Sequence, residues 1–244
     1  MSRARILSIG VDKVTMDEAV DRCIAFSKGD EPRMVVTPNA EISYRATREP
    51  DLAALINQAD LVIPDGAGVV IASRILGDPV PERVAGTDLS TKLVARMSQQ
   101  GRGRVYILGG APGVAARAAA HLTGHYPGIR VVGHHHGFFK PEEEAGVIAS
   151  IRAAETDVLF VGMGSPRQEQ WIARHKHEHR AKVSLGVGGT IDVWAGTAQR
   201  APEWMRRANL EWLFRIVKLG RVGRSLPPLA KFGLLVMARR MRGR

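Results

Sequence analysis

The chain has 244 residues, 45% of them hydrophobic, and a formal net charge of +11 at pH 7, which fits one compact domain with a basic extension. A single cysteine, Cys23, excludes an intrachain disulfide framework and fits a reducing cytoplasm. We expect neither a secretory signal nor a membrane-spanning helix, because the sequence has no basic start followed by an apolar run, and no run of about 18 apolar residues.

Apolar runs typical of strands alternate along the chain with amphipathic runs typical of helices. The predicted strands are 6–9, 34–36, 61–63, 105–108, 129–132, 158–161 and 183–185. The predicted helices are 15–27, 50–59, 67–76, 87–99, 112–126, 141–154 and 166–177. Continuously apolar strands between amphipathic helices indicate an α/β domain, with a Rossmann-like, mostly parallel sheet covered on both faces. We assign this domain to residues 1–195.

Several predicted helices begin with residues suited to that position. Thr15 and Glu18 have the spacing of a capping box, in which each side chain bonds the backbone N–H of the other residue. Pro112, Pro141 and Pro166 are expected in first turns, where the N–H that proline lacks would have no partner. These starts support the helix assignments.

Polar side chains directly follow the second and third predicted strands. Thr37 and Asn39 follow the first of these, and Asp65 lies in a Pro-Asp-Gly turn after the next. Carboxyl ends of parallel strands share one sheet edge, where ligands bind, so we expect a single polar cleft. There Asp65 can act as a general base. The structural alternatives are an Asp65 cap on the following helix, an Asn39 cap and a plain strand-end Thr37.

Candidate anion-binding residues follow these strand ends. Arg83 can clamp a diphosphate through paired hydrogen bonds, and the helix start at Gly86-Thr87-Asp88 offers backbone N–H groups. We interpret Asp88 as structural. Gly109 and Gly110 begin a glycine loop between a strand and a helix, typical of nucleotide contact or of a ligand-free tight turn. An NAD or S-adenosylmethionine enzyme is the alternative, although the glycine fingerprint is incomplete and the expected ribose-binding acid is missing.

A further glycine-rich strand end precedes the predicted helix at 166–177. Gly162 and Gly164 allow a ligand to approach the backbone, and Gln168 can read a uracil or ribose edge through its amide. Glu169 is expected to be a favourable charge at the helix N-terminus. A second phosphate turn is predicted after the strand at 183–185, at Gly188 and Gly189.

The last segment, residues 196–244, is predicted to be a basic, amphipathic appendage. We expect a helix over 202–219, an interruption at Pro227-Pro228 and a second apolar stretch over 229–237. From Glu211 onward there are nine basic residues and one acidic residue, so this part carries +8 of the net charge. Such a tail suits an anionic membrane surface or a nucleic acid. Few aromatic residues and no recognised motif argue against nucleic acid, and a homo-oligomer could bury the same apolar surface.

Metal ligation is not expected. The sequence has no Asp-x-Asp motif, and neither His134-His135-His136, placed in a predicted loop, nor His175 with His179 is accompanied by a typical zinc-binding pattern. Arg215, Arg221 and Arg224 can instead neutralise a departing diphosphate, or form a basic stripe facing solvent or membrane. We therefore predict activity without a metal or other cofactor.

Five motifs together resemble those of the WecG/TagA/CpsF glycosyltransferases, and they run in order over roughly residues 8 to 225. They are Thr37-Pro-Asn39-Ala-Glu41, Pro64-Asp65-Gly66, Arg83-x-x-Gly86-Thr87-Asp88, Gly164-x-Pro166-x-Gln168-Glu169 and Gly188-Gly189-x-x-Asp192. The resemblance implies transfer of an N-acetylmannosamine-type sugar from a UDP donor to a polyprenyl-diphosphate-linked N-acetylglucosamine. It also implies a cytoplasmic enzyme, bound peripherally to the inner face of the cell membrane, in bacterial surface-polysaccharide synthesis.

The resemblance also implies roles for individual residues. Asp65 matches the proposed base of the family, and Arg83 and Gln168 match substrate-binding positions. Thr37 and Asn39 are implied to hold the donor sugar and the acceptor near that base. The family's C-terminal appendage contributes arginines to the site, which favours such a role for Arg215, Arg221 and Arg224.

Overall fold

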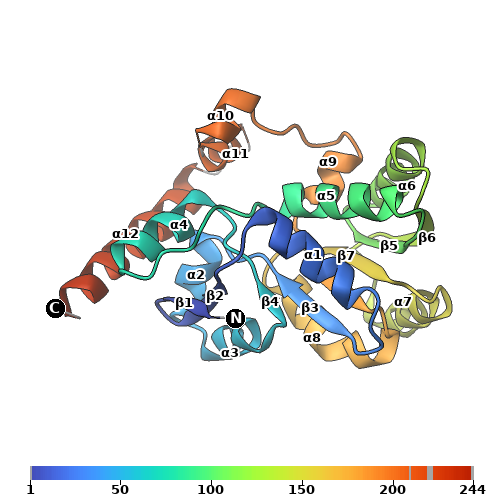
Figure 1. Cartoon of the computed structure of the whole chain (residues 1–244), viewed down its shortest axis with the longest axis horizontal. Helices are drawn as coiled ribbons and strands as arrows, with labels where there is room; N and C mark the ends of the chain where they lie inside the picture. Colours follow the sequence, from blue (N-terminus) through green and yellow to red (C-terminus); the bar gives the residue numbers. More distant parts are fainter. Residues whose placement is uncertain (1, 209, 219–221, 243–244) are drawn as a thin grey trace.

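The computed structural model describes residues 2–208, 210–218 and 222–242, with only the backbone described at 215, 216 and 222–225. In this part of the chain the main sheet has six parallel strands in the order β4-β3-β8-β7-β5-β6 (Figure 1). Their bounds are β3 Arg33–Val36, β4 Leu61–Val62, β5 Arg104–Gly109, β6 Arg130–His135, β7 Val158–Gly162 and β8 Val183–Gly186. The predicted α/β class is confirmed, but His134 and His135 end strand β6 rather than lying in a loop.

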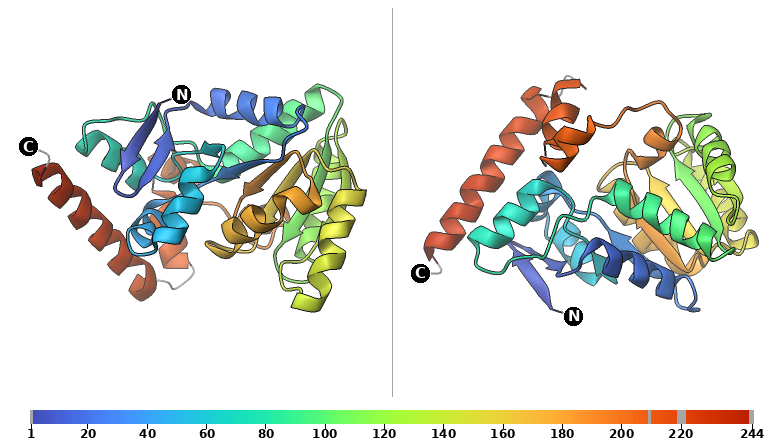
Figure 2. Two further views of the ribbon diagram at one scale, coloured as in Figure 1. Left: turned by 90° about the horizontal axis from the view of Figure 1, so that it is seen from below. Right: turned by 45° about the horizontal axis from the view of Figure 1, so that its top comes forward.

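Helices cover both faces of the sheet, each over its own buried apolar cluster (Figures 1 and 2). One face packs against α1 (Met16–Phe26), α5 (Gly86–Gln99), α6 (Val114–His125) and α9 (Thr190–Trp194). The other packs against α2 (Ala40–Ala46), α3 (Pro50–Gln58), α4 (Ala67–Ile75), α7 (Pro141–Ala153) and α8 (Arg167–His179). Two-sided burial explains why the strands are continuously apolar.

The predicted helix starts are partly confirmed. Thr15 and Glu18 form the expected capping box, and Pro141 occupies the first turn of α7. Pro112 was wrongly placed inside a helix, because α6 begins at Val114 after a left-handed Gly113. Pro166 is the N-cap of α8 rather than a first-turn residue.

The N-terminal segment forms an antiparallel hairpin of β1 (Arg3–Ile6) and β2 (Ile9–Asp12) instead of the predicted single strand at 6–9. Leu7, in the two-residue turn, has a φ of 58°. Glycine and asparagine usually occupy such positions, and this turn contains neither, so the sequence did not indicate a hairpin. The buried Asp12 accepts a hydrogen bond from the N–H of Val62, with Oδ2 2.7 Å away. The hairpin is thus attached to β4, the strand that leads to Asp65.

The appendage begins with two short helices where one was predicted. Helices α10 (Glu203–Arg207) and α11 (Glu211–Lys218) replace the expected helix over 202–219. The N–H of Leu210 donates to the carbonyl of Met205 over 2.8 Å, a wide turn of the kind that ends a helix. This break changes the direction of the chain before Glu211.

The last helix, α12 (Val222–Arg242), continues through Pro227 and Pro228, so the predicted interruption is wrong. Phe232 and Val236 are buried in the core cluster that α2 and α4 also form. We attribute the continuous helix to this packing, since tertiary burial routinely overrides local propensity.

Apart from the buried Phe232 and Val236, the described side chains of α12 include exposed apolar residues and exposed basic residues. The large exposed apolar residues are Leu226, Leu234, Leu235, Met237 and Met241, and the exposed basic residues are Lys231, Arg239, Arg240 and Arg242. No helix among the described residues is long and apolar enough to cross a membrane. An exposed surface of this composition suits an interface between water and anionic lipid.

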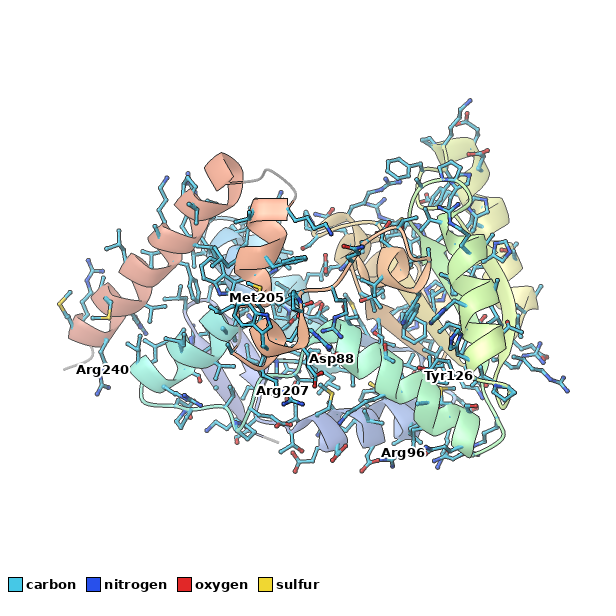
Figure 3. The ribbon with its side chains drawn as sticks, turned by 90° about the horizontal axis from the view of Figure 1, so that it is seen from above. Asp88, Arg96, Tyr126, Met205, Arg207 and Arg240 are labelled. Atoms are coloured by element: carbon cyan, nitrogen blue, oxygen red, sulfur yellow. The ribbon has the colours of Figure 1, made fainter. Side chains whose placement is uncertain are left out.

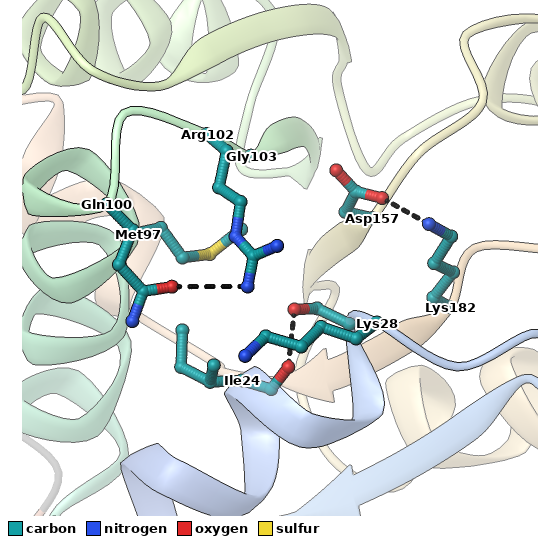
Figure 4. Close-up of a pocket in the computed structure, with 9 residues that line it drawn as sticks. Ile24, Lys28, Met97, Gln100, Arg102, Gly103, Asp157 and Lys182 are labelled. Carbon is teal, nitrogen blue, oxygen red and sulfur yellow. Dashed lines mark hydrogen bonds and ion pairs between the residues drawn. The ribbon is translucent and has the colours of Figure 1, made fainter.

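A cavity of about 300 Å³ lies at the amino ends of the strands, whereas Asp65 lies at their carboxyl ends (Figure 4). Its lining includes Gly103, Asp157 and Lys182, each directly before a strand, and the last two form an ion pair of 2.9 Å. Ligands of open α/β sheets bind at the carboxyl ends of strands, so this cavity is not the expected site.

His179, the buried last residue of α8, gives a testable pH dependence of stability. Its ring stacks on Trp171 with centroids 5.5 Å apart, and Nδ1 accepts the N–H of Ala181 over 3.1 Å. Burial, followed by the charges of His175 and His177, lowers the pKa of His179 from 6.5 to about 4. Below pH 6.5 the unfolded chain therefore binds a proton that the folded chain does not.

The free energy of unfolding should consequently fall by about 3 kcal/mol as the pH drops from 6.5 to 4. Urea unfolding across this range is expected to show that decline in the wild type and a flatter curve in His179→Gln. The control is His134→Gln, which changes an exposed histidine at the end of β6 and should keep the decline. An unchanged slope in His179→Gln would contradict the assignment.

Candidate active site

Three segments meet at the carboxyl edge of the sheet around Asp65. Thr37, after β3, is buried and donates its hydroxyl to the carbonyl of Gly186 at the end of β8, over 3.0 Å. A β-carbon at Gly86, the first residue of α5, would lie 3.2 Å from Thr37 Cγ2 and 3.5 Å from Asp65 Oδ2. Thr37 and Asp65 are therefore neighbours, as expected from the strand ends, and the start of α5 lies beside them.

Asp65 lies in a turn fixed by backbone hydrogen bonds. Its N–H donates to the carbonyl of Ile63 over 2.9 Å, and Val84 N–H donates to the carbonyl of Pro64 over 3.1 Å. The N-cap position of α4 belongs to Gly66, with a φ of 93°, and not to Asp65. The half-buried carboxylate thus stands between the start of α4 and the start of α5.

Asn39 is exposed beside this turn and has the structural role considered as its alternative. Its Oδ1 accepts the N–H of Ile42 over 3.0 Å, which caps α2. A β-carbon at Gly66 would lie 3.6 Å from Asn39 Cβ, so the side chain is close to the Asp65 turn. Capping uses only the oxygen of the amide.

Gln168 and Glu169 lie in the first turn of α8, and each is only 2% exposed. Gln168 Oε1 accepts the N–H of Gly188 over 3.1 Å, and Nε2 donates to Glu169 Oε1 over 2.8 Å. Glu169 lies in the first turn of α8, as expected for a charge at the helix N-terminus, and is buried there. Burial raises its pKa, against the opposing effect of the Gln168 hydrogen bond. The pair fixes the loop after β8.

Loops after β5, β7 and β8 pack backbone against backbone. A β-carbon at Gly109 would lie 2.4 Å from the carbonyl oxygen of Gly162, and one at Gly162 would lie 2.7 Å from that of Gly188. One at Gly110 would lie 2.6 Å from the side chain of Val114. At these positions only glycine fits, which supports the tight-turn interpretation of Gly109 and Gly110.

Other glycines of these loops border open space. β-Carbons at Gly164 and Gly188 would meet nothing within 4 Å, and one at Gly189 would meet only Asp192 Oδ2 at 4.0 Å. The helices after the adjacent strands β5 and β7 cover opposite faces of the sheet. In open α/β sheets, ligands usually bind in the crevice between two adjacent strands whose following helices lie on opposite faces. The loops after β5 and β7 are therefore suited to a nucleotide.

Arg83 belongs to a cluster of four charged residues that joins the sheet domain to the appendage. Arg200, before α10, bonds Asp88 on α5 and both carboxylate oxygens of Glu211 on α11, the latter over 3.2 Å each. Arg83 Nη1 lies 3.8 Å from Glu211 Oε2, with side chains 16% and 9% exposed. We call Arg83, Asp88, Arg200 and Glu211 the charge cluster.

The electrostatics of the charge cluster favour its ionised form. Burial would raise the pKa of Asp88, but the hydrogen bonds and charge of Arg200 outweigh it and lower this pKa. Burial would likewise lower the pKa of Arg200, and the bonds to Asp88 and Glu211 raise it instead. Neither Arg200 nor Glu211 was predicted as a site residue. No local pattern indicates that Arg200 contacts Asp88, which is 112 positions away in the chain.

The three predicted arginines of the appendage cannot be compared with this site. Arg221 lies outside the described residues, as do the side chains of Arg215 and Arg224. Among the described residues, no group of three or more His, Cys, Asp or Glu is arranged to hold a metal ion. The His run at the end of β6 makes local contacts, including a ring contact of 5.8 Å between His135 and Phe139.

Comparisons with known proteins agree with the motifs. The family described as "Glycosyl transferase WecG/TagA/CpsF family" matches residues 4–244. Relatives from Staphylococcus aureus strains MRSA252, NCTC 8325 / PS 47 and MW2 are each 36% identical over 233 residues, covering 93% of this chain and 90% of the relative. Each is named N-acetylglucosaminyldiphosphoundecaprenol N-acetyl-beta-D-mannosaminyltransferase. The chain belongs to the WecG/TagA/CpsF family and is a glycosyltransferase.

Proposed function

We propose that this glycosyltransferase moves an N-acetylmannosamine-type sugar from a UDP donor to a polyprenyl-diphosphate-linked N-acetylglucosamine, in bacterial surface-polysaccharide synthesis. The observation that carries the proposal is the position of Asp65 beside Thr37 and the start of α5, at the ligand-binding edge of the sheet. The acceptor and sugar in the names of the Staphylococcus aureus relatives support it.

The proposed reaction is a single displacement that inverts the anomeric centre. The Asp65 carboxylate takes the proton of the acceptor hydroxyl while its oxygen attacks the anomeric carbon. The bond from this carbon to the donor's diphosphate breaks, and UDP leaves with the electron pair. Arg83, with Arg215, Arg221 and Arg224 of the appendage, stabilises the charge that develops on UDP, without a metal.

The proposed donor site uses backbone more than side chains. Gly164, Gly188 and Gly189 border open space, where peptide N–H groups can meet phosphate oxygens. Gln168 contributes by holding the Gly188 loop. Thr37 and Asn39 lie next to Asp65 and are proposed to orient the two sugars.

The proposed place of the enzyme is the cytoplasmic face of the cell membrane. Exposed leucine, methionine and arginine side chains on α12 suit peripheral binding to anionic lipid. Such binding would bring Asp65 to a lipid-linked acceptor. Self-association through the same apolar surface is the alternative role of α12. Co-sedimentation with vesicles, measured at several chain concentrations, distinguishes membrane binding from self-association.

The test is UDP release from UDP-N-acetylmannosamine, with and without a lipid-diphosphate N-acetylglucosamine acceptor. We expect release that depends on the acceptor and persists in EDTA, because arginines replace a metal at the diphosphate. No release with any UDP-sugar would overturn the proposed donor class. Complete loss in EDTA, restored by magnesium, would overturn only the metal-independent mechanism.

A further inference from the structure

A cavity of about 210 Å³, separate from the one in Figure 4, lies where the N-terminal hairpin meets the last helix. Helix α4 packs against both β1 and α12, so segments from the two ends of the chain border the same space. The cavity is lined by Arg5, Leu7, Leu76, Asp78, Arg239 and Arg240. None of these residues belongs to the strand ends around Asp65, so the cavity is distinct from the candidate active site.

Two of the three arginines are placed at the cavity by the packing of α12. Arg239 and Arg240 follow the buried Val236 by three and four residues, so they lie on its side of the helix. Arg240 is near α4 in Figure 3, and a β-carbon at Gly77 would lie 3.2 Å from Arg240 Nη1. Both guanidiniums therefore border the cavity, although their side chains are exposed.

The third arginine, Arg5, comes from the opposite end of the chain. It lies on β1, and its Nε donates to the carbonyl of Leu7 over 3.3 Å. Leu7 has the left-handed backbone that costs a non-glycine residue about 1 kcal/mol or more, and such residues cluster at functional sites. The strained turn thus places a cation and an apolar side chain at one cavity.

The acidic residues near the cavity already have partners. The hairpin, α4 and α12 together contain one acidic residue, Asp12, which bonds Arg3 over 3.3 Å. Asp78, which follows α4 and lines the cavity, pairs with Lys13. Neither carboxylate is therefore available to balance the three guanidiniums fully.

A structural role accounts for only one of these guanidiniums. A cation near the C-terminus of a helix is favoured by the helix dipole, which suits Arg240 beside the end of α4. Within the part of the chain that the structure describes, Arg5, Arg239 and Arg240 form no ion pair. The cavity consequently carries an excess of positive charge that a bound anion would neutralise.

The lining of the cavity indicates the chemistry of this anion. Guanidiniums bind phosphate oxygens through paired, charge-assisted hydrogen bonds. Leu7 and Leu76 add partly buried apolar surface, and Met237, three residues before Arg240, is 50% exposed on the same helix. A phosphate group joined to an apolar chain would use both kinds of surface, whereas inorganic phosphate would use only one.

We propose that this cavity binds the phosphate headgroup of an anionic phospholipid, with the acyl chains along the exposed apolar side chains of α12. The choice of a lipid rests on the membrane contact included in the proposed function. Diffuse attraction to anionic lipid needs only charge, at about 1 kcal/mol for each basic residue near the surface. The cavity adds a contact that needs arginine, and it sets which side of α12 faces the lipid.

Arg5→Lys tests the cavity, because lysine keeps the charge but loses the paired hydrogen bonds. Calorimetry with dihexanoyl phosphatidylglycerol, below its micelle-forming concentration, measures headgroup binding by the full chain without a membrane. Arg5→Lys and Arg240→Lys are each expected to weaken binding about tenfold. The matched control Arg242→Lys lies on α12 outside the cavity lining and should change binding less than about twofold.

Wild-type affinity in both cavity variants, or the same loss in Arg242→Lys, would overturn the proposal in favour of diffuse attraction. Inorganic phosphate that binds as tightly as the lipid would overturn the lipid as the ligand. Melting temperatures show whether Arg5→Lys is folded, and Arg240→Lys decides the question if it is not. Lipid binding without sugar transfer, or without co-sedimentation on phosphatidylglycerol vesicles, would contradict the proposed function and leave the headgroup site standing.

Discussion

Asp65→Asn is expected to lower turnover by about 10²- to 10⁴-fold, the usual contribution of a general base. The amide is nearly the same size as the carboxylate but cannot accept the acceptor's proton. Donor binding should change little, because the glycine loops and arginines proposed to hold UDP are intact. Acceptor-dependent UDP release gives the turnover, and UDP calorimetry gives the binding.

Asp51→Asn is the matched control for this variant, since Asp51 is an exposed carboxylate on α3. It should release UDP at the wild-type rate. A near-normal rate in Asp65→Asn would exclude Asp65 as the base. Lost UDP binding in the same variant would instead indicate that the carboxylate organises the site.

Arg200→Gln should release α10 and α11 from the start of α5, whereas α12 stays packed against α2 and α4. Glutamine leaves Asp88 and Glu211 without their shared partner, and breaking a buried ion pair from one side costs about 3 kcal/mol. The Asp88 and Glu211 carboxylates are then expected to draw Arg83 closer, which removes this arginine from its proposed position at the diphosphate. Faster proteolysis between residues 196 and 218, together with a large loss of transfer activity, would reveal this.

Two further variants separate charge from geometry. Arg200→Lys keeps the charge but not the paired hydrogen bonds, so its activity should lie between the wild type and Arg200→Gln. Arg207→Gln removes an exposed ion pair on α10 and should leave protease resistance unchanged. Full activity and protease resistance in Arg200→Gln would show that the charge cluster does not hold α10 and α11 against α5.

The strand ends were the most predictable part of this molecule. Thr37 and Asp65 follow different strands, and the rule that parallel strands end at one edge was enough to predict that they meet, whereas the position of Gly86 beside them was not predicted. The same rule places Gly162 and Gly188 together, although their close packing depends on β7 and β8 being adjacent. Local pattern fixes where a strand ends, and topology then brings the ends together.

Features that depend on distant partners were not predictable. The hairpin turn at Leu7 has no local turn residue, and α12 continues through Pro227 because Phe232 and Val236 are buried against other helices. Gln168 has the motif of a ligand-binding residue, but its amide is used inside the protein. For α12 the cause is packing against α2 and α4, which are far from it in the chain.

The attachment of Asp12 to β4 has a consequence for the exposed edge of the main sheet. β4 is an edge strand, and edge strands offer unpaired N–H and C=O groups to other chains. The Val62 N–H is already bonded to Asp12, and Arg3 donates to the carbonyls of Asn57 and Ala59 just before the strand. The first dozen residues therefore shield this edge from strand-to-strand aggregation, a protective task independent of sugar transfer.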